Sequence, residues 1–227
     1  CRELLIGVTR FFRDGDVFEA LSERILPAIF EEHEDRVLRF WVAGCSTGEE
    51  AYTLAILARE CMERSGRVSS LKIFATDVDR DALVCAGNGL YPESIAADLP
   101  SGILDKYFIR REEQYQVTPT IREMLVFAQH NLVRDPPFTN IELVSCRNLL
   151  IYLQPVLQQQ VMASIHFSLN PNGILLLGTS EAPRATGSSF EPLDHKLKIY
   201  RSKGKKRVLT EGPLPQAPPG PGIGPEV

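Results

Sequence analysis

The sequence predicts an α/β fold with a parallel sheet and one small antiparallel insertion. Short apolar runs rich in β-branched and aromatic residues alternate with longer runs whose apolar residues recur at helical spacing. This alternation is typical of parallel sheets, because parallel neighbours need a crossover connection, usually a helix. One segment, residues 107–122 ("YFIRREEQYQVTPTIR"), breaks the rhythm and predicts a small inserted β-subdomain.

The first predicted element is a helix between residues 9 and 35. Its apolar residues recur at helical intervals, and we expect Pro27 to kink it. The apolar positions are Phe18, Leu21, Ile25, Ile29 and Phe30. We assign residues 1–36 to an N-terminal linker and a helix packed on the main domain. Because the chain starts almost at this helix, we expect a further domain upstream in the parent protein.

The next elements are a strand, a turn and a helix, followed by a second strand and helix. Residues 37–43 ("VLRFWVA") predict the first strand, and the helix after the turn is expected to stop at Gly66. Residues 71–76 predict a second strand that ends at Asp77. A short helix follows, for which Asp79 is the expected N-cap.

Three further strands are predicted, over residues 124–132, 141–148 and 173–181. Between the last two, residues 154–173 predict a helix that is closed by Asn170-Pro171 and Gly173. The final run, residues 195–203 ("HKLKIYRSK"), alternates between apolar and polar residues and predicts an edge strand.

The composition excludes several classes of function. A net charge of −4 argues against a polyanionic partner, so no nucleic-acid binding is expected. The five cysteines show no metal-ligand spacing, so no metal site is predicted. No apolar run reaches the roughly 18 residues that cross a bilayer, and no signal peptide is evident, so we expect a cytoplasmic protein without direct membrane insertion. Residues 203–227 are rich in Pro and Gly and predict a linker or disordered tail.

The turn after the first strand, "AGCSTGEE" at residues 43–50, carries the main functional signal. In open α/β sheets this position faces the place where ligands bind. Gly44 allows close backbone approach, but the turn has neither the lysine of a phosphate-binding loop nor the Gly-x-Gly-x-x-Gly pattern of a dinucleotide site. Glu49 and Glu50 suit a cationic, phosphate-free ligand such as S-adenosylmethionine. The alternative is that both acids only stabilise a helix N-terminus.

Polar residues at the ends of other strands support a ligand site. Asp77 ends the second strand, where an acid can accept hydrogen bonds from a ribose diol. Asn131 and Asn148 end two later strands, and an amide can match an adenine edge or an amino-acid group. Taken singly, each asparagine is also an ordinary strand-end turn residue.

Several motifs occur in the order and with the gaps of one known family. They are "VTRFFRD" (8–14), "AGCSTGEEAYTLA" (43–55), "FATDVD" (74–79), "NGLYP" (88–92), "HNL" (130–132), "DPPF" (135–138), "CRNLLIYL" (146–153) and "LNPNGILLLGTSE" (169–181). On these motifs the chain resembles the CheR family, the chemotaxis-receptor protein-glutamate O-methyltransferases. The resemblance implies a class I S-adenosylmethionine methyltransferase domain over residues 37–202, with a Rossmann-like, mostly parallel, doubly wound sheet. It also implies methylation of glutamates on the cytoplasmic helices of chemoreceptors.

The resemblance also assigns roles to individual residues. It implies that Arg13, together with Thr9, reaches the cofactor's carboxylate end and the reaction centre, and that Tyr152 lies near the departing methyl group. It implies that Glu50 binds the cofactor's ammonium group and that Asp77 binds the ribose hydroxyls. The remaining predicted cofactor contacts are Gly44, Asn131, Leu132, Asn148 and Leu149.

Two functions remain open from the sequence. One is an active protein-glutamate methyltransferase; the other is a non-catalytic module that binds S-adenosylmethionine or S-adenosylhomocysteine within a larger multidomain protein. Retention of Arg13 and Tyr152 favours the enzyme, because a pure binding module needs neither. The insertion is shorter than in family members that bind a receptor's C-terminal pentapeptide, so no pentapeptide tether is expected. Methylation of nucleic acid is disfavoured by the net charge, and an NAD-dependent oxidoreductase by the missing pyrophosphate glycines.

Overall fold

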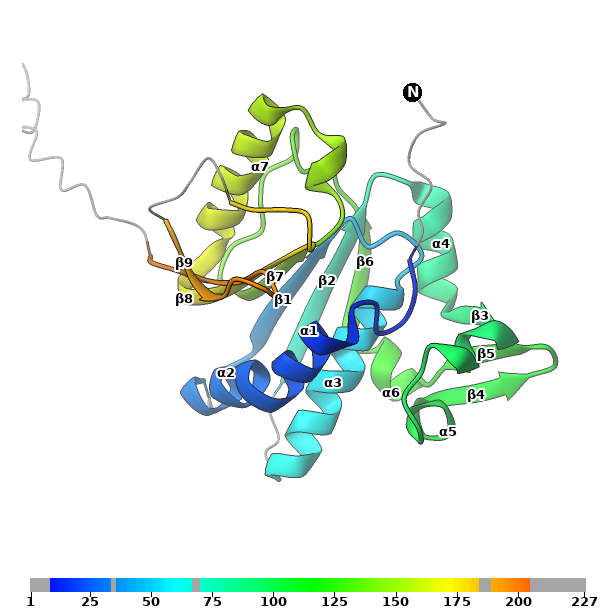
Figure 1. Ribbon diagram of the computed structural model, residues 1–227. Coiled ribbons are helices and arrows are strands. Elements are labelled where there is room, and N and C mark those ends of the chain that lie inside the picture. Colours follow the sequence, from blue (N-terminus) through cyan, green and yellow to red (C-terminus); the bar gives the residue numbers. More distant parts are fainter. Residues whose placement is uncertain (1–8, 34–35, 67–69, 184–188, 205–227) are drawn as a thin grey trace, which may run out of the picture.

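A computed structural model describes residues 9–33, 36–66, 70–183 and 189–204. The chain forms a seven-stranded sheet with helices on both faces, and a separate three-stranded sheet (Figure 1). The order of strands in the large sheet is β6-β2-β1-β7-β8-β10-β9. In chain order these strands are β1 (Leu38–Ala43), β2 (Leu71–Asp77), β6 (Leu125–Gln129), β7 (Ile141–Cys146), β8 (Leu169–Leu177), β9 (Phe190–Asp194) and β10 (Ile199–Ser202).

Most of the large sheet is parallel, which confirms the predicted fold class. Strands β6, β2, β1, β7 and β8 pair in parallel, whereas β10 pairs antiparallel with both β8 and β9. Strand β7 ("IELVSC") is buried at every position. A continuous buried run is expected of a parallel strand that is covered on both faces.

Helices cover both faces of this sheet, as the alternation of side chains along β1 shows. Phe40 and Val42 share a core with the N-terminal helices and α3, whereas Trp41 and Ala43 share a second core with α7. Figure 1 shows α7 on the opposite side of the sheet from α1 to α3. The helices are α1 (Gly15–Ala20), α2 (Leu26–Glu32), α3 (Glu49–Ser65), α4 (Arg80–Asn88), α5 (Ile103–Tyr107), α6 (Pro119–Arg122) and α7 (Pro155–Ser168), with short 3-10 helices η2 (Glu93–Ala97) and η3 (Leu150–Tyr152). Within the described ranges, none of them has the length and apolar character of a membrane span.

The predicted N-terminal helix contains a π-helical turn, η1 (Leu21–Ile25), between α1 and α2. This turn ends two residues before Pro27, which has no N–H to donate and whose ring would clash with the carbonyl one turn earlier. A wider turn relieves that clash, because its hydrogen bonds span one more residue. The irregularity therefore has a cause in the sequence.

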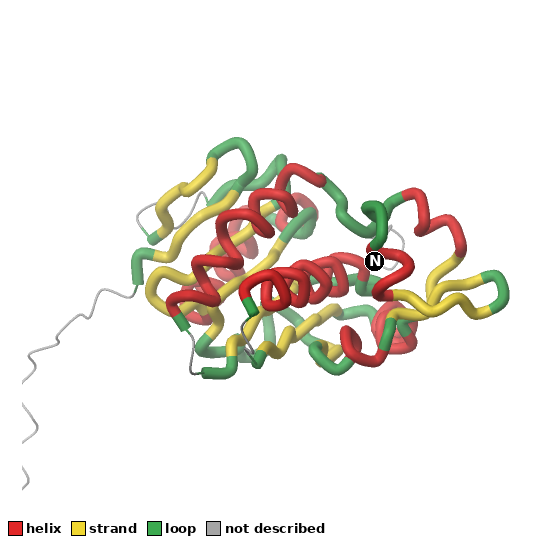
Figure 2. Tube along the Cα trace, turned by 90° about the horizontal axis from the view of Figure 1, so that it is seen from below, coloured by secondary structure: helices red, strands yellow, loops and turns green. Residues whose placement is uncertain are grey.

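The small sheet has the order β3-β5-β4 and is antiparallel. Its strands are β3 (Leu90–Pro92), β4 (Phe108–Arg111) and β5 (Gln114–Val117). Strands β4 and β5 lie in the segment 107–122, as predicted for the inserted β-subdomain. The third strand, β3, lies outside this segment, shortly after α4. In both views the β4–β5 hairpin projects away from the large sheet (Figures 1 and 2).

Two predictions near the C-terminal end were wrong in detail. Helix α7 ends at Ser168, just before the predicted stop at Asn170 and Pro171, but the next strand, which was predicted to start at residue 173, begins at Leu169, which pairs with Ile141. The predicted edge strand, β10, lies between β8 and β9. The edge is β9, which the sequence analysis missed because its segment has no clear alternation.

Candidate functional site

The order of strands defines a switch point at the carboxyl ends of β1 and β7. The chain passes from β1 to β2 and β6 on one side, and then returns to β7 and β8 on the other side of β1. Open α/β sheets bind their ligands at such a reversal. The loop that begins at Gly44 follows β1, and Asn148 follows β7, so both lie at the switch point. Asp77 ends β2, and Asn131 lies in the loop after β6.

The loop after β1 is held close to its neighbours by its backbone. The amides of Gly44 and Cys45 donate to the Thr76 carbonyl oxygen at 2.8 and 2.9 Å. Gly44 has a φ of 75°, and a Cβ added there would lie 3.1 Å from Leu149 Cδ2. The structure thus brings together Gly44 and Leu149, two predicted site residues from different motifs, and only glycine fits the conformation easily.

Asp77 fastens this loop to the end of β2. Its Oδ2 accepts a hydrogen bond from the Ser46 amide at 2.8 Å, and its Oδ1 accepts one from the Asp79 amide at 3.0 Å. Each carboxylate oxygen can accept a second hydrogen bond. Asp77 therefore has capacity left for a ligand hydroxyl.

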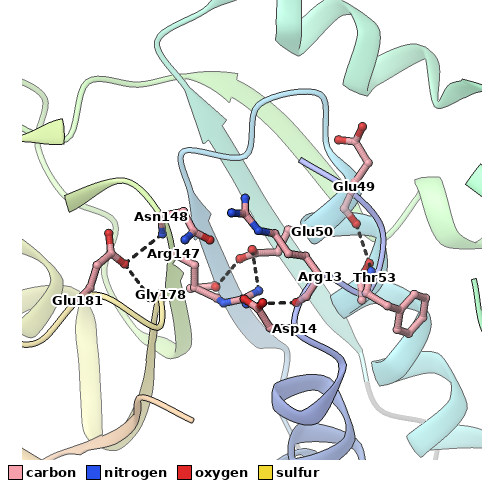
Figure 3. A network of polar contacts seen from close by, with 11 residues as sticks. Arg13, Asp14, Glu49, Glu50, Thr53, Arg147, Asn148, Gly178 and Glu181 are labelled. Carbon is pink, nitrogen blue, oxygen red and sulfur yellow. Dashed lines mark hydrogen bonds and ion pairs between the residues drawn. The ribbon is translucent and has the colours of Figure 1, made fainter. Parts of the chain in front are cut away.

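Glu50 belongs to an ion-pair network around the buried side chain of Arg147 (Figure 3). Its Oε1 accepts a hydrogen bond from the Ser145 hydroxyl at 2.5 Å, and its Oε2 lies 3.1 Å from Arg147 Nη1. The other terminal nitrogen of Arg147 lies 2.6 Å from Asp14 Oδ2 and donates to the Arg13 carbonyl at 3.1 Å. One guanidinium therefore joins the N-terminal segment to α3, and Figure 3 shows the Arg13 side chain extending over the same region as Glu50.

The N-terminal segment is also fixed to the first turn of α3. The Phe12 amide donates to Thr53 Oγ1 at 3.2 Å, and this hydroxyl donates to the Glu49 carbonyl at 2.8 Å. Burial raises the pKa of the Glu49 carboxyl, and hydrogen bonds from the hydroxyls of Thr47 and Thr9 oppose the rise. Thr9, a predicted cofactor contact, thus lies against Glu49.

The turn after β7 depends on one buried acid, Glu181. Asn148 has a φ of 57°, and its amide donates to Glu181 Oε2 at 3.0 Å. The amides of Gly178 and Ile151 donate to the same carboxylate at 2.6 and 3.3 Å. This carboxylate therefore fixes the backbone at Asn148 and at Ile151, which lies within η3. The last residue of η3, Tyr152, is 55% exposed.

The turn after β6 forms around Asn131. Its backbone amide donates to Asp135 Oδ2 at 2.7 Å, and its side-chain oxygen accepts from the Val133 amide at 3.0 Å. The side-chain NH₂ group of Asn131 is not used in this turn. Leu132 packs, together with Leu149, against the core on the α7 face of the sheet.

Four residues of this arrangement were missed by the sequence analysis: Asp14, Ser145, Arg147 and Glu181. Asp14, Arg147 and Glu181 lie inside the quoted motifs, but the motifs do not indicate which of their side chains point toward the switch point. The two cysteines nearby, Cys45 and Cys146, are neutral thiols at pH 7, because burial raises the pKa of each well above its usual value. Across the described segments, no group of three or more potential ligands could hold a metal ion.

The chain is similar to a known methyltransferase family and to several bacterial proteins. Residues 7–199 match the family model described as CheR methyltransferase, SAM binding domain. An uncharacterized 104.1 kDa protein from Rhodobacter capsulatus is 46% identical over 202 residues, which make up 88% of this chain and 21% of that protein. A chemotaxis protein methyltransferase from Borreliella burgdorferi is 34% identical over 78% of this chain and 64% of its own length.

Among solved structures, a putative S-adenosyl-L-methionine-dependent methyltransferase from Methanococcus maripaludis matches with a TM-score of 0.47 at 13% identity. The match covers 86% of this chain and 91% of that one. The chain spans about a fifth of the length of the Rhodobacter relative and about two thirds of the Borreliella relative.

Proposed function

Because this chain belongs to the CheR methyltransferase family, we propose that it methylates glutamate side chains on the cytoplasmic helices of chemoreceptors. The family makes it an S-adenosylmethionine-dependent methyltransferase domain; the protein-glutamate substrate and the receptor partner are the proposal. One observation gives it the most support. Arg13 and Glu50, which lie in different segments, are joined through Arg147 at the switch point of the sheet.

The groups present at the switch point fit S-adenosylmethionine. This cofactor carries an ammonium and a sulfonium and has no phosphate, and the loop at residues 44–48 has no lysine. We assign the cofactor's ammonium to Glu50 and its ribose hydroxyls to Asp77, since both carboxylates keep free acceptor capacity. The remaining proposed contacts are Thr9, Gly44, Asn131, Leu132, Asn148 and Leu149.

The chain's catalytic task is positioning. S-adenosylmethionine supplies an electrophilic methyl group on its sulfonium. A glutamate side chain is already ionised at pH 7, since its reference pKa is about 4.3, so the chain need not provide a general base. What remains is to orient the carboxylate and to exclude water. We assign the orienting contact to Arg13, whose guanidinium matches a carboxylate, and the shaping of its approach to Tyr152.

The partner is proposed without a tether. The β4–β5 hairpin is short, since β4 ends at Arg111 and β5 begins at Gln114. We therefore expect the domain to act on receptor helices without binding a C-terminal pentapeptide. The Rhodobacter relative is much longer than this chain, so the activity of the whole protein is likewise part of the proposal.

A methyl-transfer assay tests this function. Radiolabelled S-adenosylmethionine is incubated with the protein and purified chemoreceptor helices, and base-labile label on the receptor is counted. We expect base-labile label with the wild type, a loss of about 100-fold with Arg13→Ala and a smaller loss with Tyr152→Phe. Binding of S-adenosylhomocysteine without base-labile label on any receptor tested would favour the alternative, a non-catalytic binding module.

A further inference from the structure

Arg147 is a buried cation that the proposed reaction does not use directly. Its side chain is 1% exposed, and it follows directly after β7. Its guanidinium carbon lies 5.2 Å from the centre of the Phe18 ring, which covers it from the α1 side. The position is therefore closed to solvent.

Keeping a charge there is costly. Removing a guanidinium from water carries a large desolvation penalty, which nearby carboxylates offset only with good geometry. An apolar side chain of similar length would fill the same space without that penalty. Among the described residues, Arg147 therefore stands out as a group whose charge needs a reason other than packing.

The geometry supplies such a reason. Nη1 of Arg147 faces the Glu50 carboxylate, while Nη2 faces the Asp14 carboxylate and the Arg13 carbonyl. The guanidinium is planar and rigid, so its two ends fix the distance between the groups they bind. A lysine at this position would carry the charge but could not span both groups.

We infer that Arg147 is a positioning residue that fixes the position of Arg13 relative to Glu50. Its Glu50 arm supports cofactor binding, and its Asp14 arm supports the orientation of Arg13 during methyl transfer. This inference rests on the proposed roles of Arg13 and Glu50. The Glu50 arm can still be tested by cofactor binding alone.

Asp14→Asn isolates the second arm. Asp14 has a φ of 61°, a left-handed conformation that asparagine adopts readily, so the backbone should be preserved while the charge is lost. We expect kcat to fall about 10-fold or more, whereas the Kd for S-adenosylhomocysteine, measured by calorimetry, should change less than about 2-fold.

Arg147→Met and Arg147→Lys test both arms of the Arg147 guanidinium together. Arg147→Met should weaken S-adenosylhomocysteine binding about 10-fold or more and should also lower kcat. Arg147→Lys should recover part of the affinity, because a cation again faces Glu50, but should not recover kcat. Arg36→Met is the matched control, because Arg36 pairs with a buried acid, Glu142, near the opposite end of the strands, and it should leave the affinity unchanged.

The outcomes separate the possibilities. Equal losses of affinity and kcat in Asp14→Asn, or an Arg147→Met protein with wild-type affinity, would overturn the inference. If Arg147→Met does not fold, Asp14→Asn and Arg147→Lys still decide the matter. If the wild type methylates no receptor, the proposed function fails. The inference is then tested by affinity for S-adenosylhomocysteine alone: it holds if Asp14→Asn binds more tightly than Arg147→Lys and Arg147→Lys more tightly than Arg147→Met, and any other order overturns it.

Discussion

Two acids, the buried Glu142 and the partly buried Glu50, lie near opposite ends of the same central strands, and each pairs with an arginine. Near the amino ends, Glu142 of β7 accepts a hydrogen bond from the Arg39 amide at 2.7 Å, one from the Asn170 side chain at 2.9 Å, and pairs with Arg36 at 3.1 Å. At the carboxyl ends, Glu50 binds Ser145 and Arg147.

The difference lies in what each arginine connects. The Arg36 side chain is 49% exposed and makes a surface contact to one acid, whereas that of Arg147 is 1% exposed and joins two acids from separate segments. Ligands bind at the carboxyl ends of an open α/β sheet, so only the second network lies where a cofactor can reach it. Similar ion-pair chemistry should therefore serve stability at one end and function at the other.

The largest expected effect on stability is that of Glu142→Ala. This change leaves a backbone amide and the Asn170 amide without their acceptor in a buried place, which should cost about 3 kcal/mol of unfolding free energy. Urea denaturation measures the loss. Calorimetry on the folded fraction should show an unchanged Kd for S-adenosylhomocysteine, and a weakened Kd would break the distinction between the two ends.

Glu50→Gln should give the opposite pattern. The side chain keeps its size, but it loses the charge that faces Arg147 and the proposed cofactor ammonium. We expect affinity for S-adenosylhomocysteine to fall about 10- to 100-fold, since hydrogen bonds to charged groups contribute about 1.5 to 3 kcal/mol. Glu142→Gln is the control, and equal affinities for the two variants would contradict the account.

Gly44→Ala tests whether the cofactor needs close approach of the backbone at the carboxyl end of β1. Gly44 and Gly66 both have positive φ, 75° and 65°, but an added Cβ would meet Leu149 at 3.1 Å only at Gly44 and would meet nothing within 4 Å at Gly66. Each substitution should cost about 1 to 2 kcal/mol in urea denaturation. Only Gly44→Ala should also weaken binding of S-adenosylhomocysteine, and the same loss in Gly66→Ala would remove the argument for close approach.

The smallest expected effect is a pH dependence at Glu49. Burial raises its folded-state pKa, so its contribution to stability is fully present below the unfolded pKa and is lost as pH rises through the folded pKa. Glu49→Gln should therefore be more stable than the wild type at pH 7, and this gain should disappear as pH falls below about 4. Urea denaturation across this range tests the sign, and a difference that does not vary with pH would show that the charge is not the cause.

The sequence was sufficient for the fold where structure is local. The strand-turn-helix unit from β1 to α3, the N-cap of α4 at Asp79 and the stop at Gly66 follow from spacing and capping residues, and the structure confirms them. Strands β3 and β9 could not be found in this way. Strand β3 has only three residues and pairs with β5, which is distant in sequence. Strand β9 pairs with the neighbouring β10, but its segment ("FEPLD") has no clear alternation.

The site shows the same limit. The loop at Gly44 and the acids Glu50 and Asp77 could be proposed as site residues from the sequence, because they lie at or after strands whose ends can be predicted. Arg147 was not, because its partners Asp14 and Glu50 lie 133 and 97 residues away in sequence. A charge network that forms only on folding leaves no periodic pattern for sequence analysis to detect.

A crystal structure of the complex with S-adenosylhomocysteine would show whether the carboxylates at the switch point hold the cofactor. We predict the ligand's ammonium within hydrogen-bonding distance of the Glu50 carboxylate and its ribose hydroxyls on Asp77, with the Glu50–Arg147 pair intact. A ligand bound elsewhere, with Glu50 and Asp77 directed away from it, would contradict the account.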